Sequence, residues 1–161
     1  SVTYDPGSGG RLLVGTFQGT WIRPLAPPAD SYAAFVTGYG LNPDSSGDSG
    51  ADPDGDGWNN FLEYSFNRSP RSADQEPLIR SALEHNSGDD YLTVTYTRRK
   101  PPAGVVYIEK ASGDLNTWRT GATVTVQIRD DLNGVSETVT SRLADPVSST
   151  NRQFLGVTVT K

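Results

Sequence analysis

Residues 52 to 63 bring together side chains of the kind that bind hard cations. Aspartates stand at alternating positions, a glycine follows the third aspartate, and a glutamate ends the stretch. The predicted coordinating residues are Asp52, Asp54, Asp56, Trp58, Asn60 and Glu63. The alternation lets three carboxylates converge on one ion, Gly57 allows a sharp turn, and Glu63 adds both of its oxygens from the start of a helix. The sequence therefore predicts a Ca²⁺ site, because Mg²⁺ prefers fewer protein ligands and several waters.

The spacing of this loop matches the EF-hand pattern D-x-D-x-D-G-x5-E at every fixed position. In this pattern Trp58 offers its backbone carbonyl, and Asn60 binds the ion directly or through a water. Zinc fits poorly, since it takes His or Cys ligands and the chain has no cysteine and one histidine, His85. The competing interpretation is an acidic, solvated linker. The apolar helix predicted directly after the loop favours the metal site.

The loop departs from a paired EF-hand in several respects. Asn59 takes the position that usually carries Ile or Val, no second complete loop exists, and a Gly-, Ser- and Asp-rich run precedes the loop in place of a helix. In these respects it resembles the calcium repeats of dockerins and thrombospondin type-3 repeats. Cohesin binding by dockerins needs two such repeats, so that partner is not carried over. Asp44 and Asp48 are candidates for a second ion, but a solvated loop is favoured there because no full motif surrounds them.

Hydrophobic periodicity and turn residues predict the elements that hold the loop. Helices are expected over about 31–37, capped by Asp30, and over about 58–66. Strands are expected over 11–17, 78–83, 91–98, 105–111, 122–129, 137–143 and 154–160. The predicted fold class is mainly β: an antiparallel β-sandwich of the immunoglobulin or fibronectin kind, with a small helix–calcium loop–helix insertion near the N-terminus.

These elements divide the chain into segments. We expect an N-terminal strand and Pro-rich connector over 1–29, the helix–calcium loop–helix element over 30–70, and the sandwich domain over 77–161. The residues predicted to contribute to the sandwich core are Tyr96, Val106, Ile108, Val126, Ile128 and Phe154.

Read together, these segments resemble a module near the C-termini of large secreted bacterial proteins. The resemblance covers about residues 30–161. It rests on the order Tyr39-Gly40-Leu41, the calcium loop, Leu62-Glu63-Tyr64 and Pro70, then a phrase like Ser112-Gly-Asp114-Leu115-Asn-Thr-Trp118 and a final strand over 154–159. The resemblance implies a non-catalytic extracellular accessory module.

Composition narrows the function further. A net charge of −5 and a pI near 4.7 leave no broad basic surface, so we expect no nucleic-acid partner. No apolar run approaches the roughly 20 residues of a membrane helix, so we expect no membrane span. The chain opens at Ser1 and contains no methionine, so it is expected to be a processed chain or an excerpt. Since free calcium is abundant outside cells, the expected location is secreted, extracellular or at the cell surface.

Nothing in the sequence resembles a catalytic constellation, and we expect no enzyme. His85 lies in a turn-like run, and a lone histidine there is more typical of a solvated residue than of an acid–base catalyst. The adjacent pairs Asp89-Asp90 and Asp130-Asp131 fall at strand ends. Neighbouring residues of a strand point to opposite faces, so neither pair forms a carboxylate dyad.

Two functional interpretations remain. The leading one is a calcium-binding structural or adhesive module, with a self-assembling cell-surface or filament subunit as its most specific form. The alternative is a calcium-stabilised carbohydrate-binding module, in which Trp21, Trp58 and Trp118 would stack on sugar rings. The same tryptophans also suit an ordinary core.

The N-terminal strand over 11–17 is the most apolar short run of the chain. The predicted assembly residues are Arg11, Leu12, Leu13, Val14 and Phe17. A segment between a Gly-rich turn and three prolines can add to an open sheet edge, so other copies of the chain or neighbouring modules are its predicted partners. Pairing within the chain is an equally open outcome.

Overall fold

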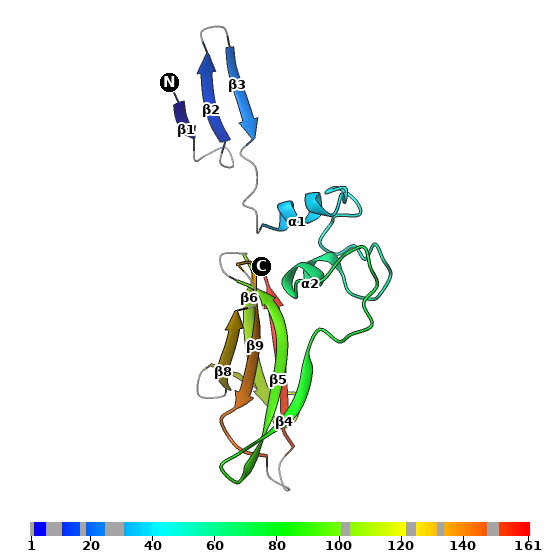
Figure 1. Cartoon of the computed structure of the whole chain (residues 1–161), viewed down its shortest axis with the longest axis vertical. Coiled ribbons are helices and arrows are strands. Elements are labelled where there is room, and N and C mark those ends of the chain that lie inside the picture. The colour runs from blue at the N-terminus through cyan, green and yellow to red at the C-terminus, as the bar shows by residue number, and fades with distance from the viewer. Residues whose placement is uncertain are drawn as a thin grey trace.

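The computed structural model describes residues 2–5, 11–16, 19–24, 31–100, 104–121, 125–131, 134–147 and 152–161, with the backbone alone described before residue 31 and over 125–128, 130 and 131. The described residues form mainly antiparallel β-structure with two short helices, as Figure 1 shows. The mainly β class predicted from the sequence is therefore confirmed.

The N-terminal segment forms a sheet of its own. Strands β1 (Val2–Asp5), β2 (Arg11–Thr16) and β3 (Gly19–Pro24) are antiparallel neighbours in the order β1-β2-β3. Both edges of the predicted assembly strand are thus occupied within the chain, and Phe17 lies outside the described residues. Assembly with other chains stays a prediction; in this sheet the outer edges of β1 and β3 are the ones that no described strand covers.

Side-chain caps set the start of both helices. Helix α1 (Tyr32–Gly38) begins after Ser31, whose hydroxyl accepts from the Ala34 amide at 3.2 Å. Helix α2 (Asn60–Ser65) begins after Asn59, whose side chain accepts from the Leu62 amide at 3.0 Å. The second helix therefore starts two residues later than predicted, because the extended backbone of its cap leaves Trp58 in the loop. Asp30, the predicted cap of the first helix, lies outside the described residues.

A small core joins the two helices. Phe35, Val36, Leu41 and Tyr64 are buried together. The rings of Phe35 and Tyr64 meet edge-on with centroids 5.3 Å apart, a favourable aromatic geometry. Gly47 in the following loop lies so close that an added methyl group would meet Val36 at 2.5 Å. The acidic run before the predicted calcium loop is therefore packed against α1.

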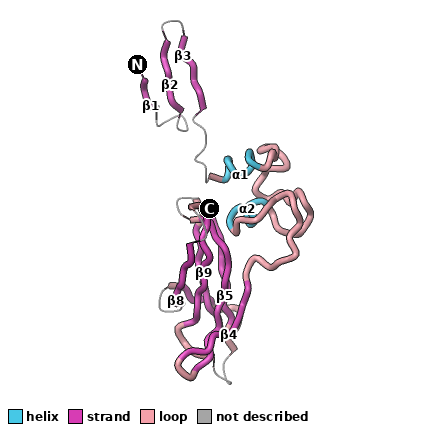
Figure 2. Tube along the Cα trace, in the orientation of Figure 1, coloured by secondary structure: helices cyan, strands magenta, loops and turns pink. Residues whose placement is uncertain are grey.

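The rest of the chain forms two antiparallel sheets. The first consists of β4 (Arg80–Asn86), β5 (Asp89–Arg99), β8 (Thr125–Asp131) and β9 (Ser136–Leu143), in the order β4-β5-β9-β8. The second consists of β6 (Val106–Ser112), β7 (Trp118–Thr120) and β10 (Phe154–Thr160), in the order β10-β6-β7. Figure 2 shows the strands along the trace. Every predicted strand is present, the last one with the predicted bounds 154–160 and the others with ends shifted by one to three residues, whereas β1, β3 and the three-residue β7 were not predicted.

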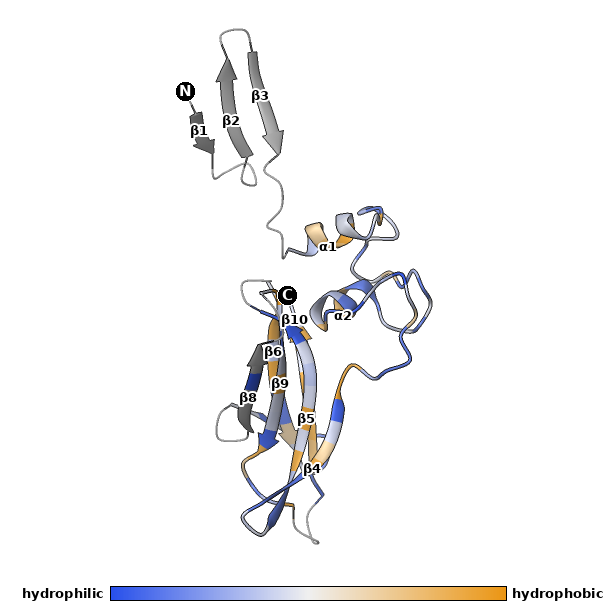
Figure 3. Cartoon of the chain, in the orientation of Figure 1, coloured by the Kyte–Doolittle hydropathy of each residue, from blue (hydrophilic) through white to orange (hydrophobic). Residues whose placement is uncertain are grey.

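The two sheets share a core. Phe66, Tyr96 and Val139 are buried there, and Tyr107, Val157 and Val159 pack against them from the second sheet. Polar groups also cross between the sheets, since the Tyr96 hydroxyl donates to Glu109 Oε1 at 2.7 Å. Figure 3 shows hydrophobic residues along these strands. The arrangement is consistent with a β-sandwich.

The predicted face of β6 is wrong. Val106 is 51% exposed and Ile108 is 38% exposed, so both point away from the core. Tyr107 and Glu109 take the inner positions instead, because their polar atoms find partners inside. Tyr96 is buried as predicted, and Phe154 is half-buried. The side chains of Val126 and Ile128 are not among those that the structure describes, so their place in the core stays a prediction.

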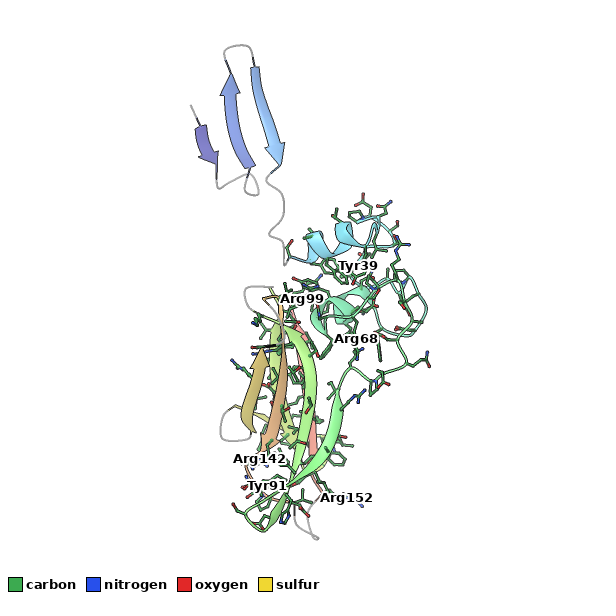
Figure 4. All side chains as sticks on the ribbon, viewed as in Figure 1. Tyr39, Arg68, Tyr91, Arg99, Arg142 and Arg152 are labelled. Carbon is green, nitrogen blue, oxygen red and sulfur yellow. The ribbon has the colours of Figure 1, made fainter. Side chains whose placement is uncertain are left out.

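Helix α2 is fastened to the sheets by its C-terminal end. Arg99 on β5 donates to the Tyr64 carbonyl at 2.8 Å, and Tyr107 on β6 donates to the Ser65 carbonyl at 2.6 Å. The Arg99 guanidinium also lies 4.5 Å from the centre of the Tyr64 ring, a cation–π contact. Figure 4 labels this arginine between the helices and the sheets. The loop before α2 is consequently anchored to a β framework.

Candidate metal centre

The structure brings the three predicted aspartates together. Asp52, Asp54 and Asp56 each place a carboxylate oxygen within 4.8 Å of the others. Backbone amides hold them, since Gly55 and Gly57 donate to the two oxygens of Asp52 at 2.8 and 2.9 Å. Both glycines have positive φ, 75° and 95°, which residues with a side chain rarely adopt. The sharp turn predicted at Gly57 is confirmed, and Gly55 adds a second one.

Glu63 lies in the first turn of α2 and is fully buried, with 0% of its surface exposed. Neither of its carboxylate oxygens has a hydrogen-bond partner. Burial, followed by the charges of Asp54, Asp56, Asp52 and Asp74, raises the pKa of Glu63 to about 8. Glu63 does not belong to the group of oxygens within 4.8 Å, but it faces the same negative charges.

Asn60 has a double role. It is 0% exposed, and its side-chain amide donates to the carbonyls of Ser46 and Asp48, each at 2.8 Å. These bonds fasten the upstream acidic run to the start of α2. The remaining side-chain oxygen, Oδ1, is buried without a partner. Asn60 is therefore a clamp that the sequence did not predict, and it keeps the free acceptor that the predicted ligand role requires.

Asp54 and Trp58 complete the predicted set. The Oδ2 atom of Asp54 is buried without a partner, and burial is the main cause that raises the pKa of this carboxyl above its usual value. The Trp58 amide donates to Asp56 Oδ1 at 2.8 Å, which fixes the loop backbone at that point. The ligand role of the Trp58 carbonyl stays a prediction.

Asp74 belongs to the surroundings of the site, although the sequence pattern does not include it. Its backbone amide donates to Asp56 Oδ2 at 2.9 Å, and its carboxylate lies 3.5 Å from the Arg68 guanidinium. It also contributes to the raised pKa of Glu63. No sequence signal identifies Asp74, because it lies in an irregular segment beyond the motif.

The two upstream aspartates take part in local hydrogen bonds of the loop that precedes the predicted site. Asp48 Oδ1 accepts from the Gly50 amide at 2.8 Å, and the Asp44 amide donates to Asn42 Oδ1 at 3.0 Å. Over the described residues, the carboxylates grouped closely enough for one ion do not include these two. A second ion at Asp44 and Asp48 therefore gains no support beyond the sequence.

The other residues singled out by the sequence lie away from the loop. His85 is exposed at the end of β4, with its Nδ1 atom 2.9 Å from Asp90 Oδ1. Trp118 donates its ring N–H to the Leu115 carbonyl and stacks under the Lys110 ammonium, 4.8 Å from the ring centre. One face of this candidate sugar platform is thus already covered. The side chain of Trp21 lies outside the description.

The unpartnered oxygens match the chemistry of a calcium ion. Asp54, Asn60 and Glu63 all present buried oxygen atoms that lack a donor, and a buried acceptor without a partner is costly. Hard oxygen donors, several of them carboxylates, are the ligands that Ca²⁺ takes. The residues present therefore fit this ion.

Comparisons with known proteins add no relative. No family model, no curated protein and no solved structure matches this chain. Among the described residues, no helix is long and apolar enough to span a bilayer.

Proposed function

We propose that this chain is a non-catalytic, calcium-binding structural module. Ca²⁺ would be held by Asp52, Asp54, Asp56, Trp58, Asn60 and Glu63. The ion would neutralise the converging carboxylates, order the acidic loop and fix the start of α2. The EF-hand-like, dockerin or thrombospondin type-3 character of the loop belongs to this proposal.

The observation that carries the proposal is the state of Glu63. A fully buried carboxylate with two unpartnered oxygens next to three aspartates is unfavourable on its own. A divalent cation at the point where these groups converge removes the repulsion and supplies the missing partner. No neutral ligand does both.

The link from α2 to the sheets gives the ion a structural role. The bonds from Arg99 and Tyr107 to the end of α2 tie the helix to both sheets, so an ordered loop would stabilise the β-rich part as well. The order β4-β5-β9-β8 also supports the immunoglobulin-like form of the sandwich, since it corresponds to strands A-B-E-D of that fold.

The wider setting of the module follows from its metal. Calcium is abundant outside cells, so the proposal places the chain in a secreted, extracellular or cell-surface protein. Its role there is structural or adhesive, with other copies or neighbouring modules as partners and assembly into a filament as the most specific form. The strand edges that no described strand covers support an assembly role.

The test is a calcium titration with unfolding as the readout. Wild-type protein stripped with EDTA is melted with increasing free Ca²⁺, and a bound ion should raise the unfolding free energy by about 2.7 kcal/mol at 100 times the dissociation constant. Glu63→Gln keeps the size of the side chain but removes the bidentate charge. It should abolish most of this gain.

Glu84→Gln is the matched control. Glu84 lies on β4, in the sheet region, and pairs loosely with Arg142 at 3.5 Å. Its substitution should leave the calcium-dependent gain unchanged. If EDTA and Ca²⁺ give the same melting temperature for the wild-type chain, the proposed function is wrong.

A further inference from the structure

The two large sheets are not matched in width. Strand β10 lies against β5, and β6 lies against β9, where Ser141 donates to Glu109 Oε1 at 3.3 Å. Since the strand orders are β4-β5-β9-β8 and β10-β6-β7, β4 has no described strand opposite it. The outer edge of β10, on the same side, is also without a described strand. One side of the sandwich is therefore open.

Leu83 shows the consequence of this opening. It pairs with Leu92, which has the same parity along β5 as the core residue Tyr96. Paired residues share a face of a sheet, so Leu83 belongs to the inner face. Yet Leu83 is 63% exposed, which is unusual for a leucine on the inner face of a sheet.

Strand β10, at the same open side but in the other sheet, also has inner-face residues that are incompletely buried. Val157 and Val159 pack against the core, and Leu155 shares their parity along β10. All three are only half-buried. An open backbone edge next to an uncovered apolar row accepts an extended strand, which pairs through its backbone and covers the row with alternate side chains.

We propose that this open side binds strand β1 of a second copy of the chain, antiparallel to β10. This inference rests on the assembly role in the proposed function. No described strand covers the outer edge of β1, and its sequence Val-Thr-Tyr-Asp alternates between apolar and polar residues. With Val2 opposite Val157 and Tyr4 opposite Leu155, its apolar residues extend the inner row.

The charges at the end of the strand agree with this direction. Antiparallel pairing in this register sets Asp5 opposite Phe154, the first residue of β10. Arg152 is exposed just before that residue, and Figure 4 labels it at this end of the sheets. The acidic end of β1 thus meets a basic side chain, and Thr3 falls opposite Gly156 on the outer face.

The tether argues for a second copy rather than the chain's own β1. Lys161 lies 5.1 Å from the Tyr32 ring, so the far end of β10 is beside the start of α1. Strands β1 and β3 run in the same direction, so antiparallel docking of the chain's own β1 would put Pro24 at the Phe154 end. From there the chain would have to return about 23 Å along β10 to Lys161 and about 14 Å across three strand spacings, a straight-line distance of about 27 Å.

The eight residues 25–32 reach at most about 26–29 Å when fully extended. The chain's own β1 would therefore dock only with this segment almost taut. A strand from another copy meets no such restriction. Because β1 and β10 are different surfaces, the contact is heterologous and generates open chains of copies unless it closes reciprocally.

Sedimentation velocity of the calcium-loaded full chain tests the proposal. The wild-type chain should associate. Leu83→Glu should raise the dissociation constant by roughly tenfold or more, since it places a charge in a buried contact. Val106→Glu is the matched control, because Val106 is similarly exposed but lies on the outer face of its sheet. It should associate like the wild type.

A deletion of residues 1–10 removes the donor strand and leaves the acceptor edge intact, so it carries the test if Leu83→Glu does not fold. A monomeric wild-type chain overturns the inference, as does a Leu83→Glu chain or a deletion chain that associates as well as the wild type. Calcium melts of the same samples separate this failure from failure of the metal proposal.

Cysteine cross-linking identifies the source of the strand, since the chain has no native cysteine. A Thr3→Cys chain mixed with a Gly156→Cys chain should form a disulfide between the copies. The space next to Gly156 admits the side chain, with Trp118 in ordinary contact at 3.8 Å. A mixture of Thr3→Cys with Val106→Cys should not cross-link. In a chain that carries both Thr3→Cys and Gly156→Cys, a disulfide formed within one chain would overturn docking between copies.

Discussion

The proposed calcium loop with the start of α2, and the core between the sheets, each bury a glutamate, but the surroundings of the two carboxylates differ. Glu109 is 8% exposed and accepts hydrogen bonds from Tyr96 at 2.7 Å and Ser141 at 3.3 Å. Glu63 is 0% exposed, and neither of its oxygens has a partner. The described residues donate hydrogen bonds to the carboxylate of Glu109 and none to that of Glu63, which instead faces the charges of further carboxylates.

The difference separates a structural charge from a ligand. A buried carboxylate that accepts hydrogen bonds is part of the folded framework, and its environment is complete without any ion. A buried carboxylate that faces other acids requires a proton or a cation. The stability lost by changes around Glu109 should therefore not depend on calcium, whereas the stability lost by changes at Glu63 should.

The largest effect is expected from Tyr96→Ala in the core between the sheets. This change leaves a cavity and removes the donor to Glu109, so it should cost roughly 3–5 kcal/mol of unfolding free energy, the range for large aromatic truncations. Tyr96→Phe removes only the donor and should cost about 1–3 kcal/mol. Urea unfolding in Ca²⁺ and in EDTA measures both.

Both losses should be similar with and without calcium, because none of the six predicted ligand residues belongs to this core. Ile108→Ala is the control, since Ile108 is 38% exposed on the outer face of β6 and should cost much less than Tyr96→Ala. Equal losses at Tyr96 and Ile108 would show that the inner and outer faces are assigned wrongly.

A second effect is expected from the pH dependence of the calcium-free protein. The pKa of Glu63 is about 8 in the folded chain, against 4.5 for a free glutamate. A pKa that is higher in the folded than in the unfolded chain stabilises the fold, and this stabilisation is fully present at pH values below the unfolded pKa. It is lost as the pH rises through the folded pKa of about 8. In EDTA the melting temperature should therefore fall between about pH 5 and 8.

Glu63→Gln should remove this fall, because a glutamine has no proton to lose. Saturating Ca²⁺ should also remove it in the wild type, since the ion takes the place of the proton and binds more tightly as pH rises. A wild-type melting temperature that rises through this range in EDTA would contradict the burial of an uncompensated carboxylate.

Sequence patterns predicted the site better than the packing around it. The positions of Asp52, Asp54 and Asp56 are fixed by local spacing, and the structure groups them as expected. The clamp role of Asn60 and the contribution of Asp74 depend on segments that meet only in the folded chain, so no local pattern contains them.

The strands were predicted by their alternation, but the inner face of β6 was not. Over residues 106–109 aliphatic side chains alternate with Tyr and Glu, and hydrophobicity alone assigns Val106 and Ile108 to the core. The structure places Tyr107 and Glu109 inside, because the facing sheet and α2 provide their hydrogen-bond partners. Such partners are distant in sequence, so the period identifies the strand without identifying its buried side.

The smallest effect is expected at a third carboxylate, Asp114, which is exposed in the turn before β7. Backbone amides of Thr117 and Asn116 donate to it at 2.7 and 2.8 Å, and these bonds hold its pKa below the usual 3.8. A pKa that is lower in the folded than in the unfolded chain stabilises the fold at pH values above the unfolded pKa. This stabilisation is lost as the pH falls through the folded pKa, which is the opposite pH dependence to that of Glu63. Asp114→Asn should therefore lower the melting temperature slightly at pH 7, and the difference from wild type should disappear as the pH falls through the lowered pKa of Asp114. Paired melts from pH 2 to 7 in EDTA isolate this difference, since all other carboxylates titrate alike in both proteins. A difference that persists at pH 2 would mean that the turn depends on the shape of the side chain and not on its charge.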